Sequence, residues 1–193
     1  MDWNLRPERT ALLNVDLQNC FVASLDDPAP LLDRINRLSA ACRASGILVI
    51  HTRHVVRADG SNLGVLAEVD RIRAGLLNEG AVTAELHPDL VVEPVDIRLD
   101  KPRFGAFTGT DLELTLRTRG IDSVIVSGIS TIVCCDTTAR EAHARDFRVF
   151  FLSDGTATAA GAEYQRLTLE VLDGLFAQVL TTDEVLAKIT AAT

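Results

Sequence analysis

SVIVSGISTIVCCDTTA, residues 123–139, joins an apolar run to the start of a helix across a single glycine. The run Ser123–Ser127 does not alternate between polar and apolar residues, which is typical of a strand buried on both faces of a parallel sheet. Gly128 favours a tight turn after the strand, and we predict a helix over Cys134–Arg145. A buried strand followed at once by a helix is the repeating unit of an α/β domain.

The same succession of strand and helix extends from this stretch toward both ends of the chain. The other predicted strands are Ala11–Asp16, Ile47–Thr52, Asp96–Leu99, Arg148–Leu152 and Gln178–Leu180. The other predicted helices are Leu31–Ala44, Asp111–Arg119, Ala162–Phe176 and Asp183–Thr190. Thr110, with Glu113 three residues later, is typical of a capping box at the start of the helix over Asp111–Arg119. Residues 53–94 show no pattern that assigns a structure.

These elements predict an α/β fold with three layers: a doubly wound parallel sheet of six strands with helices on both faces. The length of 193 residues fits one domain, which we expect to span residues 1–193. Hydrophobic residues make up 47% of the chain, which is enough to build a core and excludes a disordered protein. Ligands of such sheets bind beyond the carboxyl ends of the strands, so the site is expected there.

The charge and cysteine content narrow the class of protein. With 27 acidic and 19 basic residues, the net charge is −8, so phosphate backbones and anionic lipids repel the chain. We therefore expect no nucleic acid and no membrane as partners. The N-terminal residues lack a secretory signal, which favours a cytoplasmic protein. Four cysteines without a CxxC pair or metal-ligand spacing predict reduced thiols.

Three residues whose side chains are capable of catalysis follow predicted strands. Asp16 ends an apolar run, so its carboxylate needs a partner, although it could instead cap a following turn. Lys101 lies just past the third strand and could pair with Asp16, although most lysines are solvated. Cys134 begins a helix, whose free amides and dipole lower the pKa of a thiol and can hold an oxyanion. The structural alternative is a small core residue. Of Cys134 and Cys135, one can face the crevice and the other the core.

Together, three fragments resemble the isochorismatase-like cysteine hydrolase superfamily. They are VDLQNCF around Asp16, KPRFGAFTGTDLE from Lys101, and GISTIVCCDTTAREA around Cys134. Each motif alone is weak, but all three occur in the family's order and span most of the chain. The resemblance implies an Asp16–Lys101–Cys134 triad in a sheet of order 3-2-1-4-5-6. It also implies a cis peptide between Ile129 and Ser130, and an oxyanion hole made by the backbone amides of Ser130 and Cys134.

The chemistry that the resemblance implies is hydrolysis of a C–N bond in a small amide, carbamoyl or ureido substrate. Asp16 would take the thiol proton of Cys134, Lys101 would support the charges, and a thioester would form and then be hydrolysed. The alternatives are cleavage of a vinyl ether, as isochorismatases perform it, and a non-catalytic binding protein on the same scaffold. A redox role for Cys134 and Cys135 is disfavoured, because adjacent cysteines close a strained ring.

The sequence also bears on metals, pocket residues and assembly. Nicotinamidases of the superfamily hold a metal through an Asp-x-His pair and a further histidine, whereas residues 51–62 here read HTRHVVRADGSN. We therefore predict no metal and no cofactor, with His51 a satisfied core residue. We expect the substrate pocket to be lined by Gln18, Phe21, His54, Phe104 and Tyr164. Family members usually assemble, so we expect a homo-oligomer, either a dimer or a tetramer.

Overall fold

A parallel sheet of six strands forms the centre of the protein. The structure is a computed structural model, which describes residues 2–192 except for the side chains of residues 71 and 73. The strands are β1 (Thr10–Val15), β2 (Leu48–His54), β3 (Ile97–Lys101), β4 (Ser123–Ile129), β5 (Arg148–Ala157) and β6 (Gln178–Leu180). Their order is β3-β2-β1-β4-β5-β6, and every neighbouring pair is parallel. The predicted sheet order is therefore confirmed.

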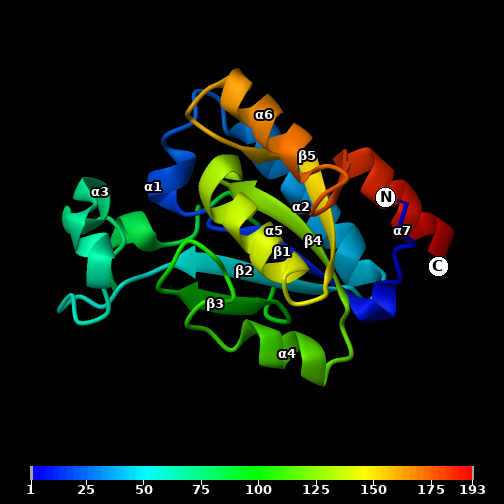
Figure 1. Cartoon of the computed structure of the whole chain (residues 1–193), viewed down its shortest axis with the longest axis horizontal. Helices are drawn as coiled ribbons and strands as arrows, with labels where there is room; N and C mark the ends of the chain where they lie inside the picture. The colour runs from blue at the N-terminus through cyan, green and yellow to red at the C-terminus, as the bar shows by residue number, and fades with distance from the viewer. Residues whose placement is uncertain (1, 193) are drawn as a thin grey trace.

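Helices cover both faces of this sheet (Figure 1). On one face α4 (Leu112–Thr118), α5 (Asp136–His143) and α6 (Ala162–Leu172) pack against the strands, and on the other α2 (Ala29–Ala44) and α7 (Thr182–Ala192) do so. Neighbouring residues of β1 face opposite layers: Leu13 belongs to the core beneath α5, and Leu12 to the core beneath α2. This two-sided burial explains why the strands are apolar without alternation.

Several boundaries differ from the sequence prediction for identifiable reasons. The helix expected over Cys134–Arg145 is preceded by a turn of π-helix, η4 (Thr131–Cys135), and continues as α5. The helix expected to reach Phe176 ends at Leu172, followed by a turn in which Gly174 has a φ of +73°. Such a φ is costly for residues other than glycine, so the turn stops the helix there.

One half of the predicted capping box at the start of α4 is present. Thr110 Oγ1 accepts a hydrogen bond from the backbone amide of Leu112 at 3.2 Å, as a capping residue does, and it also donates to the carbonyl of Ala106. The helix itself begins one residue later than predicted, after Asp111, whose side chain makes no capping hydrogen bond. Glu113, the other half of the predicted box, contacts Arg145 at 3.2 Å, just beyond the end of α5. Arg145 is a tertiary partner that the local sequence does not reveal.

Residues 53–94, which the sequence left open, form short helices beyond the carboxyl ends of the strands. They include η2 (Gly64–Glu68), α3 (Asp70–Arg73) and η3 (Val82–Ala84), and α1 (Asn19–Val22) lies beside them (Figure 1). Their apolar side chains Val56, Leu66, Ile72 and Leu77 form a small core of their own, which packs against the rest of the chain through partners including Phe21 and Phe104. Within residues 2–192, no helix combines the length and apolarity that crossing a membrane requires.

Candidate active site

Asp16 lies directly after β1, where the chain turns out of the sheet. Its φ of +52° is in the left-handed region, which Asp tolerates better than most residues. The neighbouring strand β2 holds it there: its backbone amide donates to the carbonyl of Thr52 at 3.2 Å, and the Thr52 hydroxyl donates to Asp16 Oδ1 at 2.7 Å. The carboxylate is thus fully buried, with its direction set by two strands.

Lys101, the last residue of β3, forms an ion pair with this carboxylate. Its Nζ lies 2.7 Å from Asp16 Oδ2, and both side chains are 0% exposed. The ammonium also donates to the carbonyls of Arg103 at 2.9 Å and Phe104 at 2.8 Å. Burial alone would lower the pKa of Lys101, but Asp16 and the nearby thiols outweigh it, so the pKa lies above its usual value. Lys101 therefore stays charged beside Asp16.

The loop after β3 supplies those two carbonyls and is held against α5. The backbone amide of Ala106 donates to the Thr138 hydroxyl at 3.1 Å, and that of Phe107 to the Glu141 carboxylate at 3.0 Å. At Gly105 a Cβ would lie 2.2 Å from a Glu141 oxygen, so a larger residue would displace the carboxylate that holds the loop. Residues of the fragment after Cys134 thus position the loop that surrounds Lys101.

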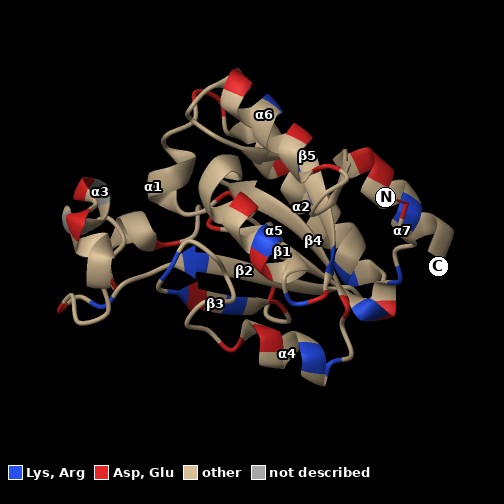
Figure 2. Cartoon of the chain, viewed as in Figure 1, with Lys and Arg blue, Asp and Glu red and all other residues tan. Residues whose placement is uncertain are grey.

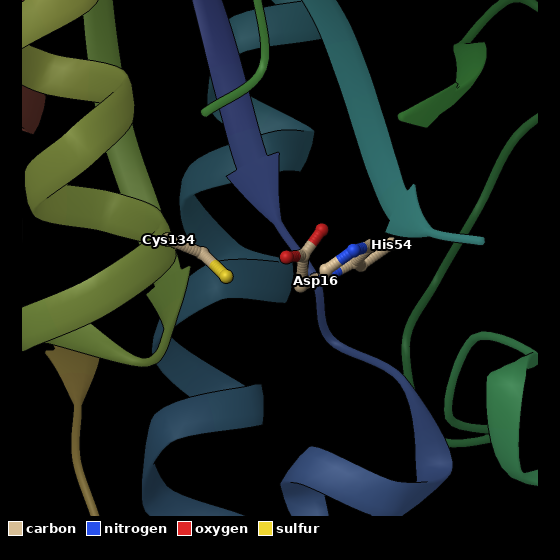
Figure 3. A group of neighbouring side chains, drawn as sticks. All are labelled: Asp16, His54 and Cys134. Atoms are coloured by element: carbon tan, nitrogen blue, oxygen red, sulfur yellow. The ribbon is translucent and has the colours of Figure 1, made fainter. Parts of the chain in front are cut away.

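Cys134 lies in η4, with its side chain directed toward Asp16 (Figure 3). Burial and then the Asp16 carboxylate raise the pKa of the thiol above its usual value, while Lys101 and the Ser130 backbone amide act in the opposite direction. The expectation that the helix start makes this thiol more acidic is therefore wrong, because burial dominates. Cys135 faces the core and is 0% exposed, so the two cysteines divide as predicted.

The peptide bond between Ile129 and Ser130 is cis, in agreement with the resemblance. It lies between β4 and η4, so it joins the sheet to the helical turn that carries Cys134. Gly128, just before it, has a φ of +123°, and a Cβ there would lie 2.0 Å from the carbonyl oxygen of Val15. Glycine is required at this approach, since β4 runs against the end of β1 where Asp16 follows.

His54 completes a buried group of side chains at the strand ends. Figure 3 shows Cys134 and His54 on opposite sides of Asp16, and one potential ligand atom of each lies within 4.8 Å of the others. Burial and then Lys101 lower the pKa of His54 to about 4, so its ring is neutral at pH 7. Among the described residues, neither ring nitrogen has a hydrogen-bond partner of ordinary geometry, although the Pro102 backbone lies near enough to affect the pKa of the ring and the side chain is fully buried. Such a group is costly unless a ligand satisfies it.

Thiol, imidazole and carboxylate are also zinc ligands, so this group could hold a metal by residue type. The Lys101 ammonium, 2.7 Å from Asp16, opposes a second positive charge there. A metal ion would also bind the Cys134 sulfur, which would then not be free to attack a substrate. The arrangement therefore fits a catalytic thiol with a buried ion pair better than a metal centre, and the prediction of no metal is kept.

A cavity of about 610 Å³ opens beside Cys134 and His54. Phe21 and Phe104 line it, as predicted, and the His54 and Phe104 rings meet edge to face with centroids 5.5 Å apart. Ile129 and Ser130 of the expected cis peptide also line it. The lining residues that the sequence did not indicate are Cys20, Ala23, Ser24, Val69, Ile72, Leu76, Leu77, Ile132, Val133, Thr158, Ala159 and Ala160. Those of residues 69–77 lack a recognisable pattern, so only the folded chain identifies them.

Two of the predicted pocket residues do not line this cavity. Gln18 is fully buried, but its amide accepts from the His54 backbone amide at 2.7 Å and donates to the carbonyl of Ala84 at 2.7 Å. Its side chain therefore links the end of β2 to η3. Tyr164 is 59% exposed on α6, because that face of the helix points away from the strand ends.

The homo-oligomer, a dimer or a tetramer, that we expect from the sequence stays a prediction.

His51 is the satisfied core histidine that the sequence predicts. One ring nitrogen lies 3.1 Å from Asp96 Oδ2 and the other 3.3 Å from Asn14 Nδ2. Its side chain is fully buried, and Arg43 balances the charge of Asp96 at 2.6 Å. Both ring nitrogens of His51 thus have partners within the fold, whereas His54 faces the cavity and its ring makes no hydrogen bond within the part of the chain that the structure describes.

Comparisons with known proteins identify the family of this chain. Residues 10–184 match the isochorismatase domain. The chain belongs to the isochorismatase family. One relative of this isochorismatase-family chain is the ureidoacrylate amidohydrolase RutB of Enterobacter sp. (strain 638). The two are 33% identical over an alignment of 199 positions, which covers 91% of this chain and 86% of the relative. Nicotinamidase 3 of Arabidopsis thaliana is 33% identical over 176 residues, covering 90% and 85% of the two chains.

The crystal structure of a cysteine hydrolase from Pseudomonas syringae pv. phaseolicola 1448A superimposes on this isochorismatase-family chain with a TM-score of 0.92. The two are 32% identical, and the match covers 100% of this chain and 97% of the other. The family fold is therefore present throughout the described chain.

Proposed function

We propose that the protein is a cysteine hydrolase that cleaves the C–N bond of a small amide, carbamoyl or ureido substrate. The observation that carries the proposal is the buried Asp16–Lys101 ion pair beside a thiol that lines the cavity. The names of two relatives, an amidohydrolase and a nicotinamidase, support the same bond type.

In the first step Asp16 acts as general base for Cys134. The raised pKa of the thiol means that it carries its proton at rest, so an adjacent base must remove it as the substrate is attacked. Sulfur then bonds to the carbonyl carbon, and the proton resides on Asp16. Lys101 keeps a positive charge beside the carboxylate, and its bonds to the carbonyls of Arg103 and Phe104 prevent it from moving.

The tetrahedral intermediate places a negative charge on the former carbonyl oxygen. We assign its stabilisation to the backbone amides of Ser130 and Cys134, which flank the thiol at the start of η4. The C–N bond then breaks, Asp16 gives its proton to the departing nitrogen, and a thioester remains on Cys134. A water molecule attacks the thioester, Asp16 accepts its proton and passes it to the sulfur, and the carboxylic acid product leaves.

The proposal predicts ammonia or amine release together with an acyl-enzyme on Cys134. A panel of nicotinamide, N-carbamoyl amino acids, biuret and ureidoacrylate analogues would be screened for ammonia, followed by acid quench and intact-mass measurement. We expect a mass increase equal to the acyl group, mapped by digestion to the peptide containing Cys134. Turnover without any covalent adduct, or an adduct on Cys20 or Cys42, would contradict the mechanism. Silence across the panel would redirect the search to vinyl ethers.

Metal ions are expected to inhibit rather than activate. Dialysis against a chelator should leave turnover unchanged, because the proposed steps use Asp16, Lys101 and Cys134 alone. Added Zn²⁺ should lower it, since zinc can displace the thiol proton of Cys134 and bind the sulfur together with the neutral His54 ring, which blocks the nucleophile. Mg²⁺, which prefers oxygen ligands, is the matched control and should have no effect. Loss of activity on chelation, restored by a metal, would contradict the metal-free site.

A further inference from the structure

We propose that Thr52 is a positioning residue for the general base: its hydroxyl fixes one oxygen of Asp16 and leaves the other to exchange protons. The inference rests on the proposed function, because it concerns the orientation of the carboxylate that removes the thiol proton. Thr52 is fully buried and is not one of the residues that line the cavity, so it acts through Asp16 rather than on the substrate.

The Thr52 hydroxyl makes two hydrogen bonds to the same residue. Its Oγ1 accepts from the backbone amide of Asp16 at 3.2 Å and lies 2.7 Å from Asp16 Oδ1. An amide N–H can only donate, so the single hydroxyl proton is left for the carboxylate. Thr52 is therefore the donor and Oδ1 the acceptor of the shorter bond. Hydrogen bonds to a carboxylate are among the stronger ones in proteins.

Asp16 needs such a partner because the sheet does not fix its side chain. The paired residues of β1 end at Asn14 opposite β2 and at Val15 opposite β4, so Asp16 lies just beyond them. Its φ of +52° also turns the chain away from strand geometry. The last torsion of an Asp side chain has broad minima, so the carboxylate would turn unless a neighbour held it.

Thr52 can hold the carboxylate because its own position is fixed. It lies within β2, opposite Leu99 of β3, and its β-branched side chain has few accessible rotamers. The next residue, Arg53, forms an ion pair with Asp100 at 2.7 Å. Figure 2 shows basic and acidic positions next to each other near the ends of β2 and β3. The two strands are thus joined where Thr52 meets Asp16.

The second carboxylate oxygen, Oδ2, keeps a lone pair for chemistry. It lies 2.7 Å from Lys101 Nζ, but none of the described groups donates a hydrogen bond of ordinary geometry to it. The Lys101 ammonium donates to the carbonyls of Arg103 and Phe104. A buried oxygen in this state gains from a further donor, and the Cys134 side chain points toward Asp16 (Figure 3). The exchanged proton is therefore carried by Oδ2.

Thr52→Val tests the hydroxyl, because valine has nearly the same shape but no O–H. The carboxylate can then turn, so we expect kcat for an amide found by the ammonia screen to fall by about tenfold to a hundredfold. KM should stay within about twofold, because Thr52 does not touch the substrate. Thr52→Ser keeps the hydroxyl and should recover kcat to within about threefold of wild type. A loss that serine does not restore, or a higher KM with unchanged kcat, would overturn the proposal.

Thr182→Val is the matched control for the loss of a buried hydrogen bond. Thr182 is also fully buried, and its Oγ1 donates to Asp154 Oδ1 at 2.8 Å, but neither residue lines the cavity beside Cys134. The two valine variants should lose similar stability in denaturant unfolding, whereas only Thr52→Val should lose kcat. An equal loss of kcat in both would show that the effect is structural and would overturn the positioning role.

Alkylation of Cys134 tests the same role without a substrate. Iodoacetamide forms an S–C bond to the sulfur, iodide leaves, and the thiol proton passes to Asp16. At pH 7 we expect this reaction to be slower in Thr52→Val by about tenfold or more, and close to the wild-type rate in Thr52→Ser. Mass spectrometry of a digest measures it, and Cys20, which lines the same cavity, is the reference in each sample.

The outcomes separate this inference from the proposed function. Equal rates of Cys134 alkylation in Thr52→Val and the wild-type protein would overturn the role of Thr52, whatever the result for amides. Equal slowing at Cys20 and Cys134 would do the same, because it would report a closed cavity rather than a turned carboxylate. An active Cys134→Ala protein would instead contradict the cysteine hydrolase mechanism, while slower alkylation in Thr52→Val would still show that the hydroxyl orients Asp16.

Discussion

Cys134→Ala is expected to lower the rate of amide hydrolysis by at least about a thousandfold. The reason is chemical rather than structural: sulfur is the atom that bonds to the carbonyl carbon, and alanine offers no nucleophile in its place. The side chain is already small and buried, so the fold should remain. Steady-state ammonia release, measured beside a thermal unfolding curve, checks both statements.

Cys135→Ala is the matched control for this result. The two cysteines are adjacent and both buried, but Cys135 faces the core, where its Sγ lies 3.9 Å from the carbonyl of Ser127. We expect its loss to cost about 1 kcal/mol of stability and to leave turnover within a few-fold of wild type. If Cys135→Ala abolished turnover while Cys134→Ala retained it, the assignment of the nucleophile would be reversed.

Lys101→Met is expected both to abolish turnover and to destabilise the protein by about 3–5 kcal/mol. Lys101 and Asp16 are each 0% exposed and lie 2.7 Å apart, so the substitution leaves a buried carboxylate without its counter-charge. The ammonium would also be lost from the site where the thiol proton is transferred. Denaturant unfolding and ammonia release measure the two effects on the same sample.

A double variant distinguishes the electrostatic cost from the catalytic role. Asp16→Asn combined with Lys101→Met removes both charges, so it should recover part of the lost stability but none of the activity. As a control, Arg37→Met breaks an ion pair of the same length with Asp183 on the surface, where the side chains are 55% and 76% exposed. It should change stability by less than about 1 kcal/mol. A Lys101→Met protein as stable as the Arg37→Met protein would show that the buried pair is not required.

The sequence predicts the sheet because its strands bury both faces. A run such as SVIVS can only be covered from two sides, and runs of this kind between helices lead to parallel neighbours. Asp16, Lys101 and Cys134 come together for the same reason, since parallel strands bring their carboxyl ends to one edge. The structure confirms their proximity, whereas their catalytic roles stay proposals.

The residues around these three could not be predicted in the same way. The walls from residues 69–77 have no periodic pattern, and they line the cavity only because their small core packs on Phe21 and Phe104. Tyr164 resembles a pocket residue in the sequence, but the direction of α6 turns it to solvent. Glu113 resembles one half of a capping box in the sequence, but its carboxylate contacts Arg145, which is distant along the chain.

The sequence by itself determined the layered α/β architecture, the order of the strands through its family resemblance, and which residues meet at the strand ends. Only the tertiary structure decided the state of those residues. It buries Cys134, which raises the pKa of the thiol against the effect of a helix start, and it leaves the His54 ring neutral at the cavity, without a hydrogen bond to any of the described residues. The physical reason is that local patterns set periodicity, whereas desolvation and charge depend on every group packed around a side chain.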